Sequence, residues 1–200
     1  GRPRESERAV TAFPPSQGQN LQIQCAVSTG PGLVERNYVY GSIDMDMNAA
    51  FMMDTIESAL KWADSNREYA GKPIVIVFDN AGCHERAEDL VLERVLENPS
   101  LPADRIYLLR LGAYSPLCNP IEGCFSVLKA YVKTYMAENR GRLLRATTRE
   151  SSEARKRALL VEAANYAMPV ITPSLVRQQE LHSAFWWGKA LRLEDMQLGS

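Results

Sequence analysis

The sequence has few of the residues that build metal–thiolate sites or disulfide frameworks. Its four cysteines, at positions 25, 83, 118 and 124, form no CxxC pair, and the 200 residues include only two histidines. Structural zinc sites need closely spaced Cys and His ligands, so we expect none here. Scattered cysteines with apolar neighbours are typical of small hydrophobic side chains in a reducing compartment.

Long apolar runs and excess charge are also missing. No run approaches the roughly 18 residues of a membrane-spanning helix, and no signal peptide is recognisable, so we expect no membrane partner. The net charge is −1, so binding to a polyanion would require local clusters of basic residues. The start at Gly1-Arg2 instead of Met suggests an internal cut from a longer protein.

The remaining composition is that of an ordinary folded domain. Hydrophobic residues make up 46% of the chain and charged residues 24%, which is enough apolar material for a core. Alternating apolar and polar residues on either side of a Thr29–Gly32 turn predict an antiparallel hairpin of strands 21–27 and 33–40. Residues 1–20 are interpreted as a loop with one short strand at 8–13.

An uninterrupted apolar run, Ile74–Phe78, is typical of a central parallel strand that helices bury on both faces. Helical spacing of apolar residues recurs around it, with Asn48 as the expected cap of the first helix. After the hairpin we predict helices at 49–65, 85–97, 120–139 and 151–167 and buried strands at 74–78 and 106–109. The tail from Thr172 shows no clear period. This order predicts an α/β domain with a mixed sheet, antiparallel hairpin first and parallel strands after it.

Asp79 is the first candidate for chemistry. It directly follows the buried strand, and ligands of open α/β sheets gather beyond the carboxyl ends of the strands. The alternative is that Asp79-Asn80 only caps the next helix or forms a turn.

Glu122 is the second candidate, at the end of the segment Tyr-Ser-Pro-Leu-Cys-Asn-Pro-Ile-Glu. This short loop leads into a helix with Pro120 in its first turn. A glutamate there can simply complement the helix dipole. However, the strand that ends near Leu111 should lie beside the one that ends at Asp79, so both carboxylates can face one sheet edge. Paired acids with little positive charge nearby are costly unless a divalent cation lies between them.

Together the two segments resemble the mariner-like branch of the DDE transposase superfamily. Its members carry a DNA-x-x-H segment, here Asp79-Asn80-Ala81 with His84, and then a Y-S-P-x-x-N-P-I-E segment, here residues 114–122. The resemblance implies an RNase H-like fold and divides the chain in two. Residues 1–140 would form a DDE catalytic domain truncated at its N-terminus, and residues 141–200 a basic helical C-terminal extension.

The resemblance also implies a chemistry. In the family, two Mg²⁺ (or Mn²⁺) ions held by three carboxylates activate a water or a DNA 3′-hydroxyl for in-line attack on a phosphodiester. Asp79 and Glu122 would be the catalytic, metal-binding pair. Asn80, His84 and Asn119 would shape the site or contact DNA. The partners would be transposon ends and target DNA, with a homodimer possible.

One departure from the family pattern matters. The family's first catalytic Asp lies on a central strand upstream of the glycine-arginine pair, and this chain begins at that pair. Asp44 and Asp46 follow the hairpin, which is the wrong place. We therefore expect the chain alone to be inactive as a nuclease, and we expect backbone groups next to the missing strand to need other partners.

A basic stretch follows the second motif. Between Lys129 and Arg157 basic residues outnumber acids, which favours phosphate contact over an ordinary solvated face. The candidates for DNA contact are Lys129, Lys133, Arg142, Arg145 and Arg149. The aromatic Phe185-Trp186-Trp187 segment is expected to make a small core contact rather than to stack on bases.

Three functional hypotheses follow. The leading one is a fragment of a DDE transposase that cleaves and transfers DNA strands with divalent metal. The second is a decayed or domesticated transposase that binds DNA without catalysis, and the third is an RNA–DNA hybrid hydrolase, against which the Asn119–Glu122 segment argues. We expect a nuclear protein in a eukaryote, or one of the cytoplasm and nucleoid in a bacterium.

Overall fold

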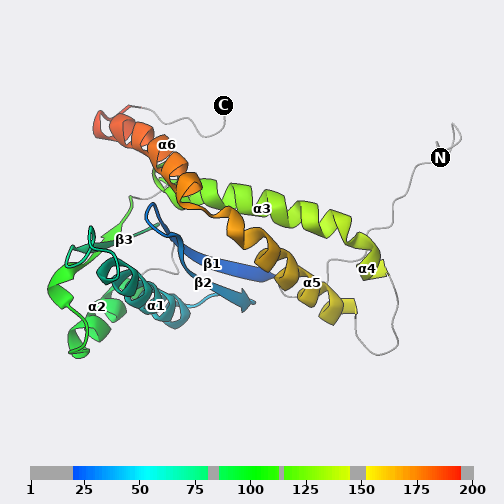
Figure 1. Cartoon of the computed structure of the whole chain (residues 1–200), viewed down its shortest axis with the longest axis horizontal. Helices are drawn as coiled ribbons and strands as arrows, with labels where there is room; N and C mark the ends of the chain where they lie inside the picture. Colours follow the sequence, from blue (N-terminus) through cyan, green and yellow to red (C-terminus); the bar gives the residue numbers. More distant parts are fainter. Residues whose placement is uncertain (1–19, 81–85, 113–114, 145–151, 195–200) are drawn as a thin grey trace, which may run out of the picture.

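The computed structural model describes residues 20–80, 86–112, 115–144 and 152–194, which form two two-stranded sheets and the helices around them (Figure 1). The strands are β1 (Leu21–Ser28), β2 (Gly32–Tyr40), β3 (Ile74–Phe78) and β4 (Ile106–Arg110). The α-helices are α1 (Met45–Asp64), α2 (Ala87–Glu97), α3 (Pro120–Glu138), α4 (Arg140–Leu144), α5 (Ser152–Ala167) and α6 (Pro173–Leu191). The strand expected at 8–13 lies outside the described residues.

The predicted hairpin is confirmed. β1 and β2 pair in antiparallel register, from Leu21 opposite Tyr40 to Ser28 opposite Gly32, with a bulge between Ala26 and Val27. Gly32 has a φ of 81°, a left-handed conformation that glycine adopts without strain. The hairpin is joined to α1 by a buried polar contact, in which Gln24 Nε2 donates to Asn48 Oδ1 over 2.8 Å.

The predicted parallel strands are also present, as β3 paired with β4. Their carboxyl ends are level, since Phe78 lies opposite Arg110 and the Leu111 N–H donates to the Phe78 carbonyl over 2.8 Å. Helices α1 and α2 cover one face of this pair and share a core with Phe78. The expectation that both faces are buried is wrong: the second face leaves four side chains exposed by 45–53%, namely Val75, Val77, Tyr107 and Leu109.

The predicted α/β class, with an antiparallel hairpin and a parallel pair, is therefore confirmed, but the strands form two sheets instead of one. Among the described strands, β1 pairs with β2 alone and β3 with β4 alone. Each sheet has its own core. The first core joins β3 and β4 to α1 and α2, and the second joins β1 to α3, α5 and α6.

Two helix predictions need correction. Helix α1 begins at Met45, and its cap is Asp44, whose Oδ1 accepts the Met47 N–H over 2.9 Å. Asn48 is inside the helix and hydrogen-bonds to β1 instead, as described above. The tail from Thr172, in which no period was recognised, is helix α6, capped by the Thr172 hydroxyl.

Helices α5 and α6 are packed into the second core. Met168, Ile171 and Val176 lie there with Cys25 of β1 and Leu128 of α3. The boundary expected at residue 140 stays a prediction, but the segment that follows it contributes directly to the packing of the hairpin. No single described helix is long and apolar enough to cross a membrane; Glu153–Val170 and Pro173–Leu191 pass that test only as a pair bent by 77°.

An exposed polar cluster joins α3, α4 and α5. Both guanidinium nitrogens of Arg142 donate to the Glu162 carboxylate, each over 2.8 Å, and the Tyr135 hydroxyl donates to the same carboxylate. The hydrogen bonds from Arg142, and then that from Tyr135, lower the pKa of Glu162 from 4.5 to about 2.

This cluster predicts an acid-sensitive contribution to stability. Because the folded-state pKa of Glu162 lies below the unfolded value, its stabilisation is present above pH 4.5 and is lost as the pH falls towards 2. The free energy of unfolding, measured with urea across this range, should fall less steeply for Glu162→Gln and for Arg142→Gln than for the parent. Salt at 1 M should weaken the difference because the group is exposed. Equal slopes in all three proteins would contradict the assignment.

Candidate functional site

Asp79 is placed by the strand that precedes it. Phe78 is buried in the first core, and the chain leaves the sheet at Asp79, which is half-buried, and at Asn80, which is exposed. The packing of Phe78 therefore holds the carboxylate at the carboxyl end of β3, the edge that the sequence predicted.

Glu122 is placed by the loop that opens α3. Pro116–Cys118 forms one 3₁₀ turn, and the buried Asn119 then caps α3, with its Oδ1 accepting the Ile121 N–H over 3.4 Å. Pro120 occupies the first helical position, where its fixed φ suits the helix and its missing N–H is not needed. Glu122 lies in this first turn with its side chain exposed. The rigid loop expected from the sequence is therefore observed.

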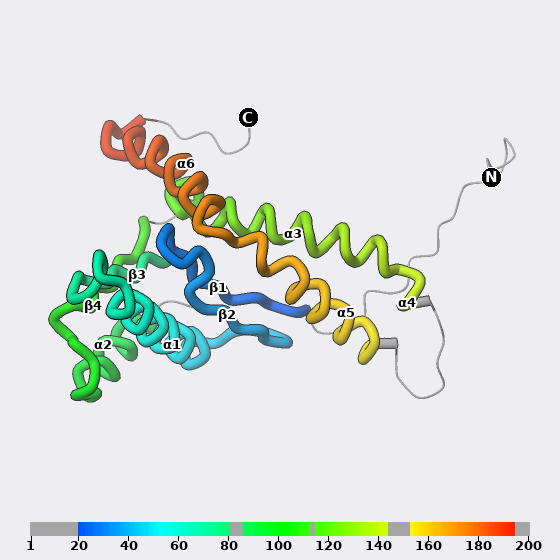
Figure 2. The backbone as a smooth tube through the Cα atoms, in the orientation of Figure 1, coloured from blue at the N-terminus to red at the C-terminus, as the bar shows by residue number. Residues whose placement is uncertain are grey.

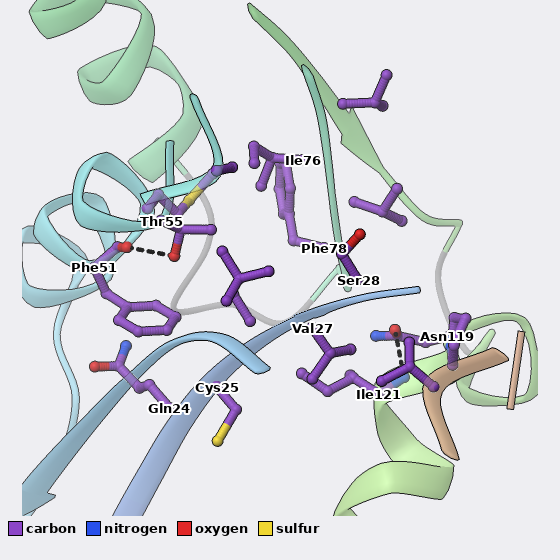
Figure 3. Close-up of a pocket in the computed structure, with 18 of the residues that line it drawn as sticks. Gln24, Cys25, Val27, Ser28, Phe51, Thr55, Ile76, Phe78, Asn119 and Ile121 are labelled. Atoms are coloured by element: carbon purple, nitrogen blue, oxygen red, sulfur yellow. Dashed lines mark hydrogen bonds between the residues drawn. The ribbon is translucent and has the colours of Figure 1, made fainter. Parts of the chain in front are cut away.

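A cavity of about 730 Å³ brings the two segments together. It lies between β1 and β3, with α1 on one side and the start of α3 on another, and its lining includes Asp79, Asn119 and Glu122. Figure 3 shows the surrounding side chains, among them Val27, Ser28, Ile76, Phe78 and Ile121. The two predicted carboxylates thus border one space, although their catalytic role stays a prediction.

The other predicted site residues differ in where the structure places them. His84, Arg145 and Arg149 lie outside the described residues. Lys129 and Lys133 are exposed on α3. Arg142 is held in the ion pair with Glu162 on α5, so its charge is already partly neutralised within the chain.

Cys25, Cys118 and Cys124, the cysteines among the described residues, behave as hydrophobic side chains. Burial raises the pKa of Cys25 to about 12 and raises the pKa of Cys124 as well, because the charged thiolate would lose its solvation. Both thiols lie in the second core beside Leu128. A buried thiol that stays protonated packs as a small apolar group.

Helix α6 adds residues that sequence reasoning missed. Val176, Glu180 and Trp187 also line the cavity. Their helix has little amphipathic pattern because it packs against several elements, so periodicity gave no signal. Glu180 brings a third carboxylate to the lining, yet the described residues hold no group of three Asp, Glu, His or Cys side chains suited to a metal ion.

A family model for DDE superfamily endonucleases matches residues 4–144, more than half of the chain. The chain belongs to the DDE superfamily endonucleases. Both motif segments fall within the matched part. Curated proteins and solved structures give no match to this chain.

Enzymes of the DDE superfamily are generally dependent on a divalent metal, and the donors at this cavity fit such an ion in kind. Asp79 and Glu122 supply hard carboxylate oxygens, the ligand type that Mg²⁺ and Mn²⁺ prefer. In number the fit is incomplete, since two carboxylates leave a third ligand to come from outside the described residues.

The cap of α3 gives a direct test of how Glu122 is held. Asn119→Ala removes the side-chain acceptor at the helix start and should cost about 1 kcal/mol of unfolding free energy. Asn119→Ser keeps an acceptor and should lose much less. Urea unfolding followed by tryptophan fluorescence measures both variants. Equal losses in the two would show that the cap does not support this turn.

Proposed function

We propose that this chain carries part of the active site of a DDE transposase, which cleaves and transfers DNA strands with the help of divalent metal. The observation that supports the proposal most is the shared cavity, whose lining includes Asp79 from the end of β3 and Glu122 from the first turn of α3. Bound metal would supply charge stabilisation for the entering and leaving oxygens of the phosphodiester.

The chain's own residues would set the geometry of that site. Asp79 directly follows the carboxyl end of β3, and Glu122 lies in a capped helix that begins with a proline. Neither carboxylate therefore depends on a long loop for its position. Sites on rigid elements keep their ligands within the narrow tolerances that catalysis requires. The two acids would bind the cation, and Asn119 would act by fixing the helix start.

The third carboxylate would come from a β-strand that lies in the cavity and belongs to a segment outside the described residues. β1 and β3 both border this space along their lengths, and each has an edge that no described strand occupies. A strand placed there would pair with both neighbours at the usual spacing of about 4.8 Å and make one mixed sheet. An aspartate near the end of that strand would complete the ligand set.

Exposed lysines on α3 support DNA as the substrate. Lys129 and Lys133 follow Glu122 by seven and eleven residues, so each lies within about 20° of Glu122 around the helix axis, on one helix face. The lysines follow the glutamate at about 10 and 16 Å along the axis. A DNA backbone that reaches Glu122 along α3 would therefore meet both positive charges.

The alternative is a transposase-derived protein that binds DNA without cutting it. The described residues hold no group of three Asp, Glu, His or Cys side chains suited to a metal ion, and this observation favours the alternative. Both functions imply contact with DNA, and the transposase would also contact transposon ends and assemble as a dimer. In a eukaryote either protein would work in the nucleus.

Cleavage by the full-length protein distinguishes the two functions. With Mg²⁺ or Mn²⁺, Asp79→Asn and Glu122→Gln should each lower strand cleavage by at least about 100-fold, since metal ligands are lost. Asp89→Asn on α2 and Glu138→Gln at the end of α3 remove exposed acids away from the cavity and serve as matched controls. Parental cleavage in both site variants would overturn the proposal, and binding without cleavage in the parent would support the alternative.

The lysine face predicts a salt effect. Lys129→Gln with Lys133→Gln should reduce the slope of log affinity against log salt concentration by about 2, close to 0.9 for each lost phosphate contact. The control pair Lys61→Gln and Arg67→Gln makes the same change in net charge at exposed positions outside α3 and outside the cavity lining. Fluorescence anisotropy on duplex DNA gives both slopes. An equal effect in the two pairs would mean that the α3 face has no special role.

A further inference from the structure

Helix α6 lies outside the residues that match the family model, yet it borders the candidate site. Figure 2 shows α6 beside the first turns of α3, at the end of α3 that carries Glu122. One hydrogen bond joins the two regions across 69 residues of sequence: the indole Nε1–H of Trp187 donates to the Cys118 carbonyl over 2.8 Å.

The bonded carbonyl belongs to the loop that sets the start of α3. Within this loop, the Cys118 N–H donates to the Ser115 carbonyl and the Asn119 N–H to the Pro116 carbonyl, both over 3.1 Å. The Cys118 side chain is 6% exposed. Trp187 adds a donor from outside to a part-buried carbonyl of this loop, and loss of that donor removes one of the hydrogen bonds that hold the loop.

A second contact from α6 lies at the same first turn of α3. At Gly123, which follows Glu122, a Cβ atom would come within 1.9 Å of the Gln179 Oε1 atom of α6. The Gln179 side chain of α6 therefore lies directly against the α3 backbone at this glycine. Trp187 also lines the cavity together with Asp79 and Glu122. It therefore borders the candidate site as well as bonding to the loop that precedes α3.

We propose that Trp187 is a positioning residue: its indole N–H fixes the Pro116–Asn119 loop and thereby the first turn of α3 that carries Glu122. The role in catalysis rests on the proposed function, whereas the restraint on the loop does not. On this proposal helix α6 contributes to the candidate nuclease site. A chain cut after α4 would lose the restraint that Trp187 places on the loop.

The neighbouring tryptophan gives a matched control. Trp186 also donates its indole N–H, but to His182 Nε2 within α6, over 3.2 Å. Trp187→Phe and Trp186→Phe each remove one indole N–H and keep an aromatic ring on the same helix. Only the first should release the loop.

Amide hydrogen exchange measures the restraint directly. In the full chain, peptides covering residues 115–124 should exchange about fivefold faster in Trp187→Phe than in the parent, as expected for one lost hydrogen bond. Trp186→Phe should exchange like the parent there. In full-length protein that cleaves DNA, Trp187→Phe should also need several-fold more Mg²⁺ for half-maximal cleavage, with most of the rate recovered at saturating Mg²⁺.

The outcomes separate the two proposals. Equal exchange in the two variants would overturn the inference, whether or not the protein cuts DNA. Faster exchange with an unchanged Mg²⁺ requirement would reduce Trp187 to a structural contact and overturn its positioning role. A parent that does not cleave would count against the proposed function alone, because the exchange result still decides the restraint.

Discussion

Backbone groups at the edge of a strand need hydrogen-bond partners, and this requirement governs the layout of the chain. The hairpin and the parallel pair each satisfy one side of their inner strands, β1 and β3, and face each other across a cavity. Each half has its own hydrophobic core. Each half is therefore stabilised by side-chain burial that does not require pairing between the two sheets. Two sheets with separate cores therefore enclose a space that suits one further strand.

The candidate site depends on this arrangement because its two carboxylates come from different halves. Asp79 belongs to the half built on α1 and α2, whereas Glu122 belongs to the half built on α3, α5 and α6. Their separation is then set by whatever holds the halves together, including the Gln24–Asn48 contact between β1 and α1. A strand that paired with both β1 and β3, as proposed above, would fix the separation through backbone hydrogen bonds.

Local sequence predicted the parts of the site that local forces determine. The apolar run before Asp79 and the Asn-Pro pair before Glu122 encode a strand end and a helix start, and both are observed. Tertiary contacts decided the rest. Asn48 has a good capping side chain, but Asp44 takes that role because Gln24 binds Asn48 in the interior. Val75 and Val77 sit in a run that is apolar throughout, and only the placement of the helices leaves them exposed. Helix α6 had no recognisable period because its contacts come from α3, the 3₁₀ turn and the hairpin at once.

Under the proposed function, local positive charges would allow a nearly neutral chain to approach DNA. Carboxylates at the cavity would repel phosphates, so a substrate can approach only if cations offset them. Bound metal would do so at the acids themselves, while Lys129 and Lys133 extend the favourable field along α3. Arg142 contributes less, because its ion pair with Glu162 is used to join α4 to α5. Under the proposed function the basic stretch would have two roles, which the structure separates: Lys129 and Lys133, on the face of Glu122, would contact DNA, whereas Arg142 forms the ion pair that joins α4 to α5.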